Sequence, residues 1–166
     1  MTKIGLDVMW WDKIIWKISG VEERLIGWLN ALKISPEMEL FLFWNKELIL
    51  SLLENKKVNV LLSPEKNREK DFIHYRNSGL NQVLCNLAKR NGIAIGFDFN
   101  NVLNAQNKEE ILGRMMQNVR LCRKYKIRML IFDLTNERSK EELRSFCVVL
   151  GMTPGEAKGA VNFKYL

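Results

Sequence analysis

The chain has 166 residues and a mass of 19.5 kDa, with 47% hydrophobic and 27% charged residues. This composition is ordinary for a globular domain of this length and excludes a disordered or collagen-like chain. Lys and Arg outnumber Asp and Glu by 26 to 19, and the net charge of +7, with a pI near 9.4, favours an anionic partner such as nucleic acid.

The cysteines and the apolar runs narrow the class further. Cys85, Cys122 and Cys147 are far apart, so they predict neither a zinc site nor a disulfide framework, and each lies in an apolar-periodic segment that predicts burial. No apolar stretch is long enough to cross a bilayer, and charged residues interrupt the apolar core that a signal peptide would need. We therefore expect a reduced, cytoplasmic protein with no membrane partner.

In the first half of the chain, short apolar runs alternate with stretches of helical periodicity. Strands are expected at residues 4–10, 39–44 and 58–63, and helices at residues 21–32 and 46–55. A charged loop, residues 65–77, then interrupts the alternation.

The alternation is clearer in the second half. Helices are expected at residues 80–90, 108–126, 139–150 and 155–160, and strands at residues 93–99, 128–134 and 161–165. Asn91 and Gly92 predict a left-handed helix end, and Ser139 with Glu142 has the spacing of a capping box. Thr153, before a proline, predicts the start of the last short helix.

This regular alternation is typical of parallel βαβ units with right-handed crossovers. The expected six or seven strands favour a barrel or a doubly wound sheet, and a full eight-unit barrel usually needs at least about 200 residues. We therefore expect an α/β fold, an abbreviated or irregular TIM-like (β/α) barrel, in which residues 1–166 form a single domain.

Most of the excess positive charge lies after Val83, because residues 114–128 hold six Lys and Arg and no Asp or Glu. Apolar residues such as Met115 and Val119 form one stripe of the expected helix 108–126, which places most of its basic residues on the opposite, exposed side. The helix dipole accounts for part of this pattern. The complete lack of acidic residues favours contact with RNA phosphates.

Basic and aromatic residues also alternate in the charged loop, a mixture that suits unpaired RNA. These residues are Lys66, Arg68, Lys70 and Arg76, with Phe72, His74 and Tyr75 between them. Three acidic residues of the same loop dilute its charge.

Other chemistry has weaker support. His74, the single histidine, has neither a GxSxG nor an HExxH motif to work with, and it is expected on the surface of the loop. Asp98 and Asp133 follow expected strands, at the end where barrel enzymes hold catalytic groups, so an alternative is a small TIM-like enzyme acting on a phosphorylated metabolite. A third possibility is a protein-binding scaffold that uses the tryptophans of the first 44 residues.

Three segments carry a family resemblance. They are RNSGLNQVLCNLAKRNGIAIGFDF (76–99), ILGRMMQNVRLCRKYKIRMLIF (111–132) and LRSFCVVLGMTPGEAKGAVNF (143–163). In this order and spacing they resemble protein component 3 of archaeal ribonuclease P, the family of the thirty-kilodalton subunit of the eukaryotic enzyme. The N-terminal part is shorter than the family pattern by about one βα unit or more.

The resemblance implies a TIM-like fold and a role as an RNA-binding subunit of ribonuclease P, an endoribonuclease that removes the 5′ leader from precursor tRNA. It implies that the RNA subunit carries catalysis with Mg²⁺, so that this chain has no catalytic residue, metal site or cofactor of its own. The implied partners are ribonuclease P RNA, precursor tRNA and the component 2 protein, the last as a heterotetramer with two copies of each protein.

The resemblance also suggests which residues touch RNA. These are Arg76, Lys89, Arg90, Arg114, Arg120, Arg123, Lys124 and Lys126; Arg128, from the same basic cluster, is expected to touch RNA as well. No contact is expected at Asp133, because its charge would repel a phosphate.

Overall fold

The computed structural model describes residues 39–42, 50, 53–54, 58–66, 70–133 and 138–162, which all fall within one unit of the chain, Pro36–Leu166. Its strands are β1 (Glu39–Leu42), β2 (Val58–Leu62), β3 (Ala94–Asp98) and β4 (Met129–Phe132). Its helices are α4 (Gln82–Asn91), α5 (Phe99–Asn104), α6 (Lys108–Tyr125), α7 (Lys140–Val149) and α8 (Pro154–Val161). The strand expected at residues 4–10 and the helix expected at 21–32 lie outside the described residues.

The four described strands form one parallel sheet whose strand order follows the chain, β1-β2-β3-β4. Every residue of β3 and β4 is buried, which explains why these strands read as continuous apolar runs rather than as an alternating pattern. The expected α/β class with a parallel sheet is confirmed, whereas these four strands do not by themselves make a barrel.

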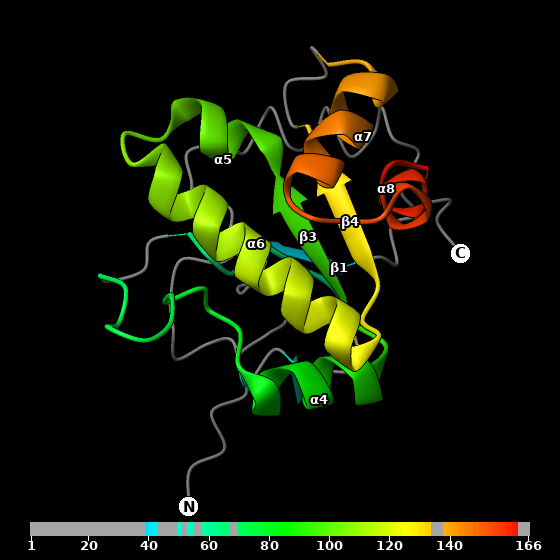
Figure 1. The fold of residues 1–166 in the computed structure, drawn as a ribbon. Helices are drawn as coiled ribbons and strands as arrows, with labels where there is room; N and C mark the ends of the chain where they lie inside the picture. The colour runs from blue at the N-terminus through cyan, green and yellow to red at the C-terminus, as the bar shows by residue number, and fades with distance from the viewer. Residues whose placement is uncertain are drawn as a thin grey trace, which may run out of the picture. The chain divides into compact units, whose positions relative to one another are not determined.

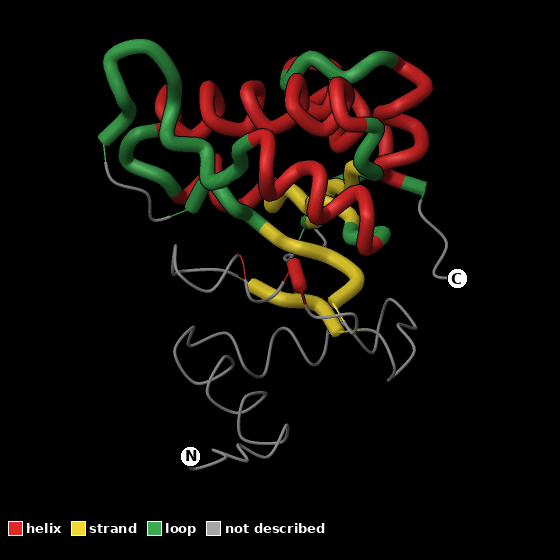
Figure 2. The backbone as a smooth tube through the Cα atoms, turned by 90° about the horizontal axis from the view of Figure 1, so that it is seen from below, coloured by secondary structure: helices red, strands yellow, loops and turns green. Residues whose placement is uncertain are grey.

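The helices cover the sheet and close the core. Figure 1 shows α6 crossing in front of β3, with α5 at its start and α4 near its end, while α7 and α8 lie beside β4. Figure 2 shows most of the described helical residues gathered on one side of the strands. The core between them is filled by fully buried side chains such as Phe97, Phe132 and Met115. No described helix is both long and apolar enough to cross a membrane.

Local sequence signals explain most of the helix boundaries. Gly92 ends α4 in the left-handed conformation, with φ 71°, as expected. The capping boxes at Ser139 and Thr153 are both present and start α7 and α8. The helix expected from residue 80 starts later, because the Asn81 side chain accepts a hydrogen bond from the Leu84 amide and caps the helix there.

The structure differs from the sequence-based expectations at two places. Helix α5 was not expected; it begins where the Asp98 side chain accepts a hydrogen bond from the Asn100 amide, directly after β3. The strand expected at 161–165 is wrong at its start, because Val161 is the last residue of α8, and residues 163–166 lie outside the described part.

Gly96 is closely enclosed by side chains of the two neighbouring strands. A Cβ atom there would lie 2.8 Å from Leu62 Cδ1, 2.8 Å from Phe132 Cε2 and 3.2 Å from Val60 Cγ1. The side chains of both neighbouring strands therefore occupy the space that a larger residue would need.

We predict that Gly96→Ala lowers the free energy of unfolding by about 1–3 kcal/mol, because the added methyl group overpacks a closed core. Chemical denaturation measures this change. Gly155→Ala is the control, since nothing lies within 4 Å of its Cβ position. Equal stability of the two variants would contradict the packing described for Gly96.

Candidate nucleic-acid interface

Basic side chains gather where the strands begin. Lys89 and Arg90 lie in the last turn of α4, just before β3, and Lys124 lies in the last turn of α6, just before β4. The starts of the two strands are adjacent, because the Ile95 amide donates to the Arg128 carbonyl at 2.9 Å, and α4 packs against α6. We call Lys89, Arg90, Arg120, Lys124, Lys126 and Arg128 the basic rim.

All six side chains of the basic rim belong to exposed residues. None of them has a carboxylate within ion-pair distance in the part of the chain that the structure describes. The Lys124 ammonium lies 5.5 Å from the centre of the Tyr125 ring, a cation–π contact that does not neutralise its charge. The charge of the basic rim is therefore available to an anionic partner.

Arg114 does not belong to this surface. The expected exposure of Arg114 is wrong: the residue is 2% exposed, and its guanidinium lies 2.7 Å from Asp71 and 3.6 Å from Glu110. Helical periodicity could not show this, because the loop that covers Arg114 comes from more than 40 residues earlier in the chain.

Asp71 fixes the charged loop onto α6. It accepts hydrogen bonds from Arg114 Nε, Arg76 Nη1 and the Asn77 amide. Partial burial would raise the pKa of Asp71, but these hydrogen bonds and the charge of Arg114 lower it overall. The charge of Arg76, which is 47% exposed, is thus matched by a carboxylate 3.0 Å away.

Amide side chains of α6 also hold the charged loop against this helix. The Gln117 amide donates to the Arg76 carbonyl and accepts from the Arg76 amide, so one side chain holds both backbone groups of that residue. Buried Asn118 donates to the Ser78 carbonyl at 2.9 Å. At Gly113, a Cβ would lie 2.3 Å from the Arg76 guanidinium carbon, so this glycine makes room for the arginine.

The attached loop presents an apolar tip to solvent. Ile73 is 96% exposed, and the rings of Phe72 and Tyr75 stack with centroids 4.6 Å apart. His74 is exposed, as expected. Of the expected basic contacts in this loop, Lys70 is exposed, Lys66 is half-buried, and Arg68 lies outside the described residues.

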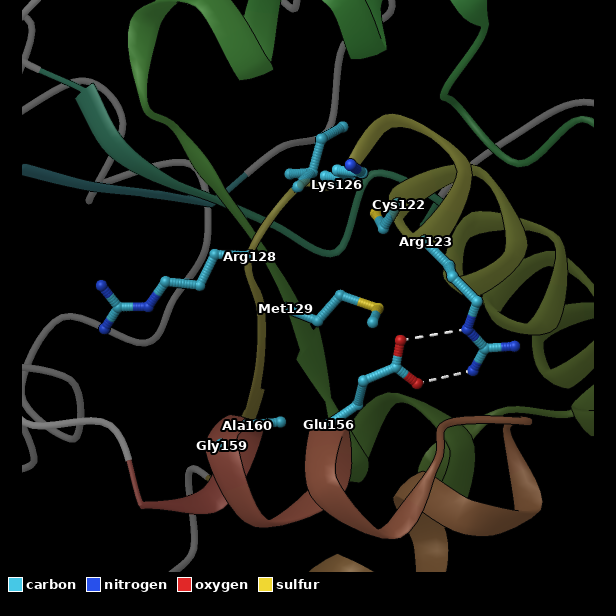
Figure 3. A pocket seen from close by; sticks show the side chains of 9 residues that line it. Cys122, Arg123, Lys126, Arg128, Met129, Glu156, Gly159 and Ala160 are labelled. Atoms are coloured by element: carbon cyan, nitrogen blue, oxygen red, sulfur yellow. Dashed lines mark hydrogen bonds and ion pairs between the residues drawn. The ribbon is translucent and has the colours of Figure 1, made fainter.

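Arg123 is also held by a carboxylate. Its Nε and Nη2 donate to the two oxygens of Glu156 at 3.0 and 2.6 Å, and Nη2 also donates to the Gly151 carbonyl. The hydrogen bond from Arg123 lowers the pKa of Glu156 to about 2, so the pair stays charged at neutral pH. This pair ties the end of α6 to the start of α8 (Figure 3).

Asp98 and Asp133 lie at the opposite ends of their strands from the basic rim. Both are at most 6% exposed, and Asn100 links them, because its backbone amide donates to Asp98 Oδ1 and its side-chain amide donates to Asp133 Oδ1, both at 3.0 Å. The Arg138 amide donates to Asp133 Oδ2 at 2.8 Å. The two carboxylates therefore converge, as the enzyme alternative requires; each accepts hydrogen bonds from amide groups, and the charge of Lys66 also acts on Asp98.

Sequence reasoning did not single out Asp71, Gln117 or Glu156 for these contacts. The pairing of Glu156 with Arg123 joins residues 33 positions apart and has no local signal. The three cysteines are free and buried, as expected, and burial raises the pKa of Cys85 to about 11. Among the described residues, no three His, Cys, Asp or Glu side chains are grouped so that they could hold a metal ion.

We predict that Asp71→Ala lowers the free energy of unfolding by about 2–4 kcal/mol, because it leaves the Arg114 guanidinium buried without its nearest carboxylate. Urea denaturation measures the change. Lys70→Ala, an exposed neighbour, should stay within about 0.5 kcal/mol of the wild type. A loss no larger than that of Lys70→Ala would show that Asp71 does not fix the loop.

We also predict a pH dependence from Asp98. Burial raises its pKa from 3.8 to about 6, so between these values the folded chain binds a proton that the unfolded chain does not. The stability that Asp98 contributes is therefore fully present below about pH 4 and is lost as the pH rises through 6. Asp98→Asn should flatten this fall in denaturation experiments at pH 4–7, and an unchanged pH slope would contradict the assignment.

The comparisons with known proteins agree with the sequence motifs. No family model matches the chain. Curated proteins named ribonuclease P protein component 3 do match: that of Methanosarcina acetivorans is 33% identical over 119 residues, 66% of this chain and 45% of the relative. The Thermococcus gammatolerans protein is 34% identical over 113 residues, 64% of this chain and 50% of the relative. The chain thus spans about half the length of the curated relatives it matches.

The fold has a solved counterpart as well. A chain in the cryo-EM structure of archaeal ribonuclease P with mature tRNA superposes with a TM-score of 0.64 at 22% identity, over 84% of this chain and 58% of that chain. The fold is therefore shared with a chain of that assembly. The resemblance carried by the three motif segments is confirmed: over about two thirds of its length, this chain is similar to ribonuclease P protein component 3.

Proposed function

We propose that this chain is an RNA-binding protein subunit of ribonuclease P, which supports the RNA-catalysed removal of the 5′ leader from precursor tRNA. The observation that carries this proposal is the basic rim, six exposed cations without a described carboxylate partner in the final turns of α4 and α6 and just before β4. The similarity to proteins named as components of ribonuclease P supports it independently.

The role is electrostatic. Each Lys or Arg of the basic rim that meets a phosphate releases condensed counterions, which favours binding at low and moderate salt. Because these side chains are mounted on packed helices and a buried sheet, binding would hold RNA segments in a fixed arrangement and lower the Mg²⁺ concentration that the catalytic RNA needs. Catalysis and Mg²⁺ belong to the RNA in this proposal.

The proposal narrows the set of nine basic residues expected to touch RNA. Arg76, Arg114 and Arg123 each pair with a carboxylate, and these pairs hold the charged loop and α8 in place. We assign them to positioning and the six residues of the basic rim to RNA contact.

The proposal also covers the complete fold and the further partners of the chain. Strands in chain order are what a (β/α) barrel requires, so we propose that the four-stranded sheet is part of an irregular TIM-like barrel. We propose precursor tRNA as a further partner, since the structural counterpart is a chain of an archaeal ribonuclease P with mature tRNA. We also propose the component 2 protein, as a heterotetramer, which the motif resemblance implies. The cytoplasmic location stays a prediction.

Removing charge from the basic rim should change the salt dependence of RNA binding. Lys89→Ala with Lys124→Ala should reduce the slope of log K against log salt by about 0.7–0.9 for each lost phosphate contact. The matched control is Lys108→Ala with Lys140→Ala, which removes the same charge from the first turns of α6 and α7. Filter binding to ribonuclease P RNA at several salt concentrations measures the slope for both double variants. Equal slopes would show that the basic rim does not contact RNA.

Reconstitution tests the function itself. The chain is added, with its partner proteins, to the RNA subunit, and precursor-tRNA cleavage is measured at limiting Mg²⁺. We expect faster cleavage than with the RNA and the other proteins alone. No gain would defeat the subunit assignment, and leader removal by the lone polypeptide would defeat the assignment of catalysis to RNA.

A further inference from the structure

A pocket of about 360 Å³ opens beside the basic rim, between the end of α6, the start of β4 and α8. This volume is within the range of about 300–1,000 Å³ that is typical of small-ligand sites. Two residues of the basic rim, Lys126 and Arg128, line it. Figure 3 shows Lys126 at the α6 side, Gly159 and Ala160 at the α8 side, and Met129 between them.

The lining of the pocket is divided by chemistry. Met129, Ile127 and Ala160 line it with apolar atoms, each residue being at most 8% exposed, and Lys126 places positive charge at the α6 side, whereas the Arg128 side chain extends away from Met129 and Glu156 (Figure 3). On the α8 side, nothing lies within 4 Å of the Cβ position of Gly159, so this part of the pocket is open. An apolar lining next to a cation matches a flat base that is linked to a phosphate.

One side of the pocket is held in place by hydrogen bonds within the protein. The two hydrogen bonds between Arg123 and Glu156 span from α6 to α8, and the Gly151 carbonyl holds the same guanidinium. Because Glu156 already matches the charge of Arg123, this arginine is a positioning residue. The cation left for an anion at the pocket is Lys126, which has no carboxylate partner in the described residues.

The backbone of Lys126 has a conformation that residues other than glycine rarely adopt. Its φ of 55° and ψ of 45° lie in the left-handed region, which glycine adopts without steric cost. The chain uses Gly92 and Gly151 at the left-handed positions that follow α4 and α7. A lysine in the equivalent place after α6 therefore stabilises the fold less than a glycine would, which is typical of a residue kept for binding.

We propose that this pocket seats one unpaired nucleotide of bound RNA, with its base against the apolar lining beside Gly159 and its phosphate at Lys126. The inference rests on the proposed function, because it takes RNA as the partner. It adds a defined subsite to a surface that otherwise neutralises phosphates along the RNA backbone.

Two glycines of α8 provide a matched pair of variants. Gly159→Leu fills the pocket, whereas Gly155→Leu adds the same side chain to the same helix at a position that does not line the pocket and is equally open. We expect Gly159→Leu to weaken RNA binding by about 5-fold or more, the loss typical of one base–side-chain contact, and Gly155→Leu to leave it unchanged. Both should keep or raise the melting temperature, because leucine favours a helix more than glycine does.

Lys126→Gly separates binding from folding. Relief of the left-handed backbone should raise the melting temperature by about 2–4 °C, while loss of the ammonium group lowers RNA affinity and reduces the salt slope by about 1. A variant that gains stability and loses affinity cannot be explained by misfolding.

Small probes identify what the pocket holds. Adenosine 5′-monophosphate should shift the amide NMR signals of Met129 and of residue 159 in the wild type but not in Gly159→Leu, and inorganic phosphate should bind more weakly. Equal binding of phosphate and nucleotide, or a Gly159→Leu variant that binds RNA like the wild type, would overturn the proposal. If Lys89→Ala with Lys124→Ala still weakens RNA binding in that case, the proposed function stands without this subsite; if it does not, both fail.

Discussion

The direction of the parallel sheet decides where charge can gather in this protein. Because each covering helix runs back against the strands, α4 and α6 both end where β3 and β4 begin. Cations in the last turns of these helices interact favourably with the helix dipoles and lie next to the strand starts. The buried carboxylates Asp98 and Asp133 lie at the other end, where the strands finish. One geometric rule therefore separates the basic rim, the proposed RNA surface, from the buried carboxylates of Asp98 and Asp133.

Ion pairing then divides the basic residues into two groups. Arg114 and Arg76 share Asp71, and Arg123 is held by Glu156, so these guanidinium groups join segments that are distant in the sequence. Arginine suits this work because its planar group donates several hydrogen bonds in fixed directions. The lysines of the basic rim have no described carboxylate partner, and they remain available as point charges for phosphates. Counting positive residues alone would have credited both groups with the same role.

Sequence patterns predict the parts of this structure that depend on neighbours in the chain. The capping box at Ser139, the helix start at Thr153, the left-handed Gly92 and the buried strands β2 to β4 all follow from local signals, and the structure confirms them. The burial of Arg114 depends instead on a loop more than 40 residues away, and α5 depends on how Asp98 emerges from the sheet. The basic rim was predictable as a cluster of charges, whereas the pocket beside it required knowledge of where α8 packs against β4.

The central claim is that RNA phosphates meet the side chains at the start of the strands rather than cations elsewhere on the protein. Chemical acetylation of lysines, read by mass spectrometry with and without ribonuclease P RNA, tests this claim on the unaltered chain. The account predicts that RNA protects Lys89, Lys124 and Lys126, while Lys108 and Lys140, at the first turns of α6 and α7, react equally in both samples. Uniform protection of all five lysines, or protection of Lys108 and Lys140 alone, would contradict it.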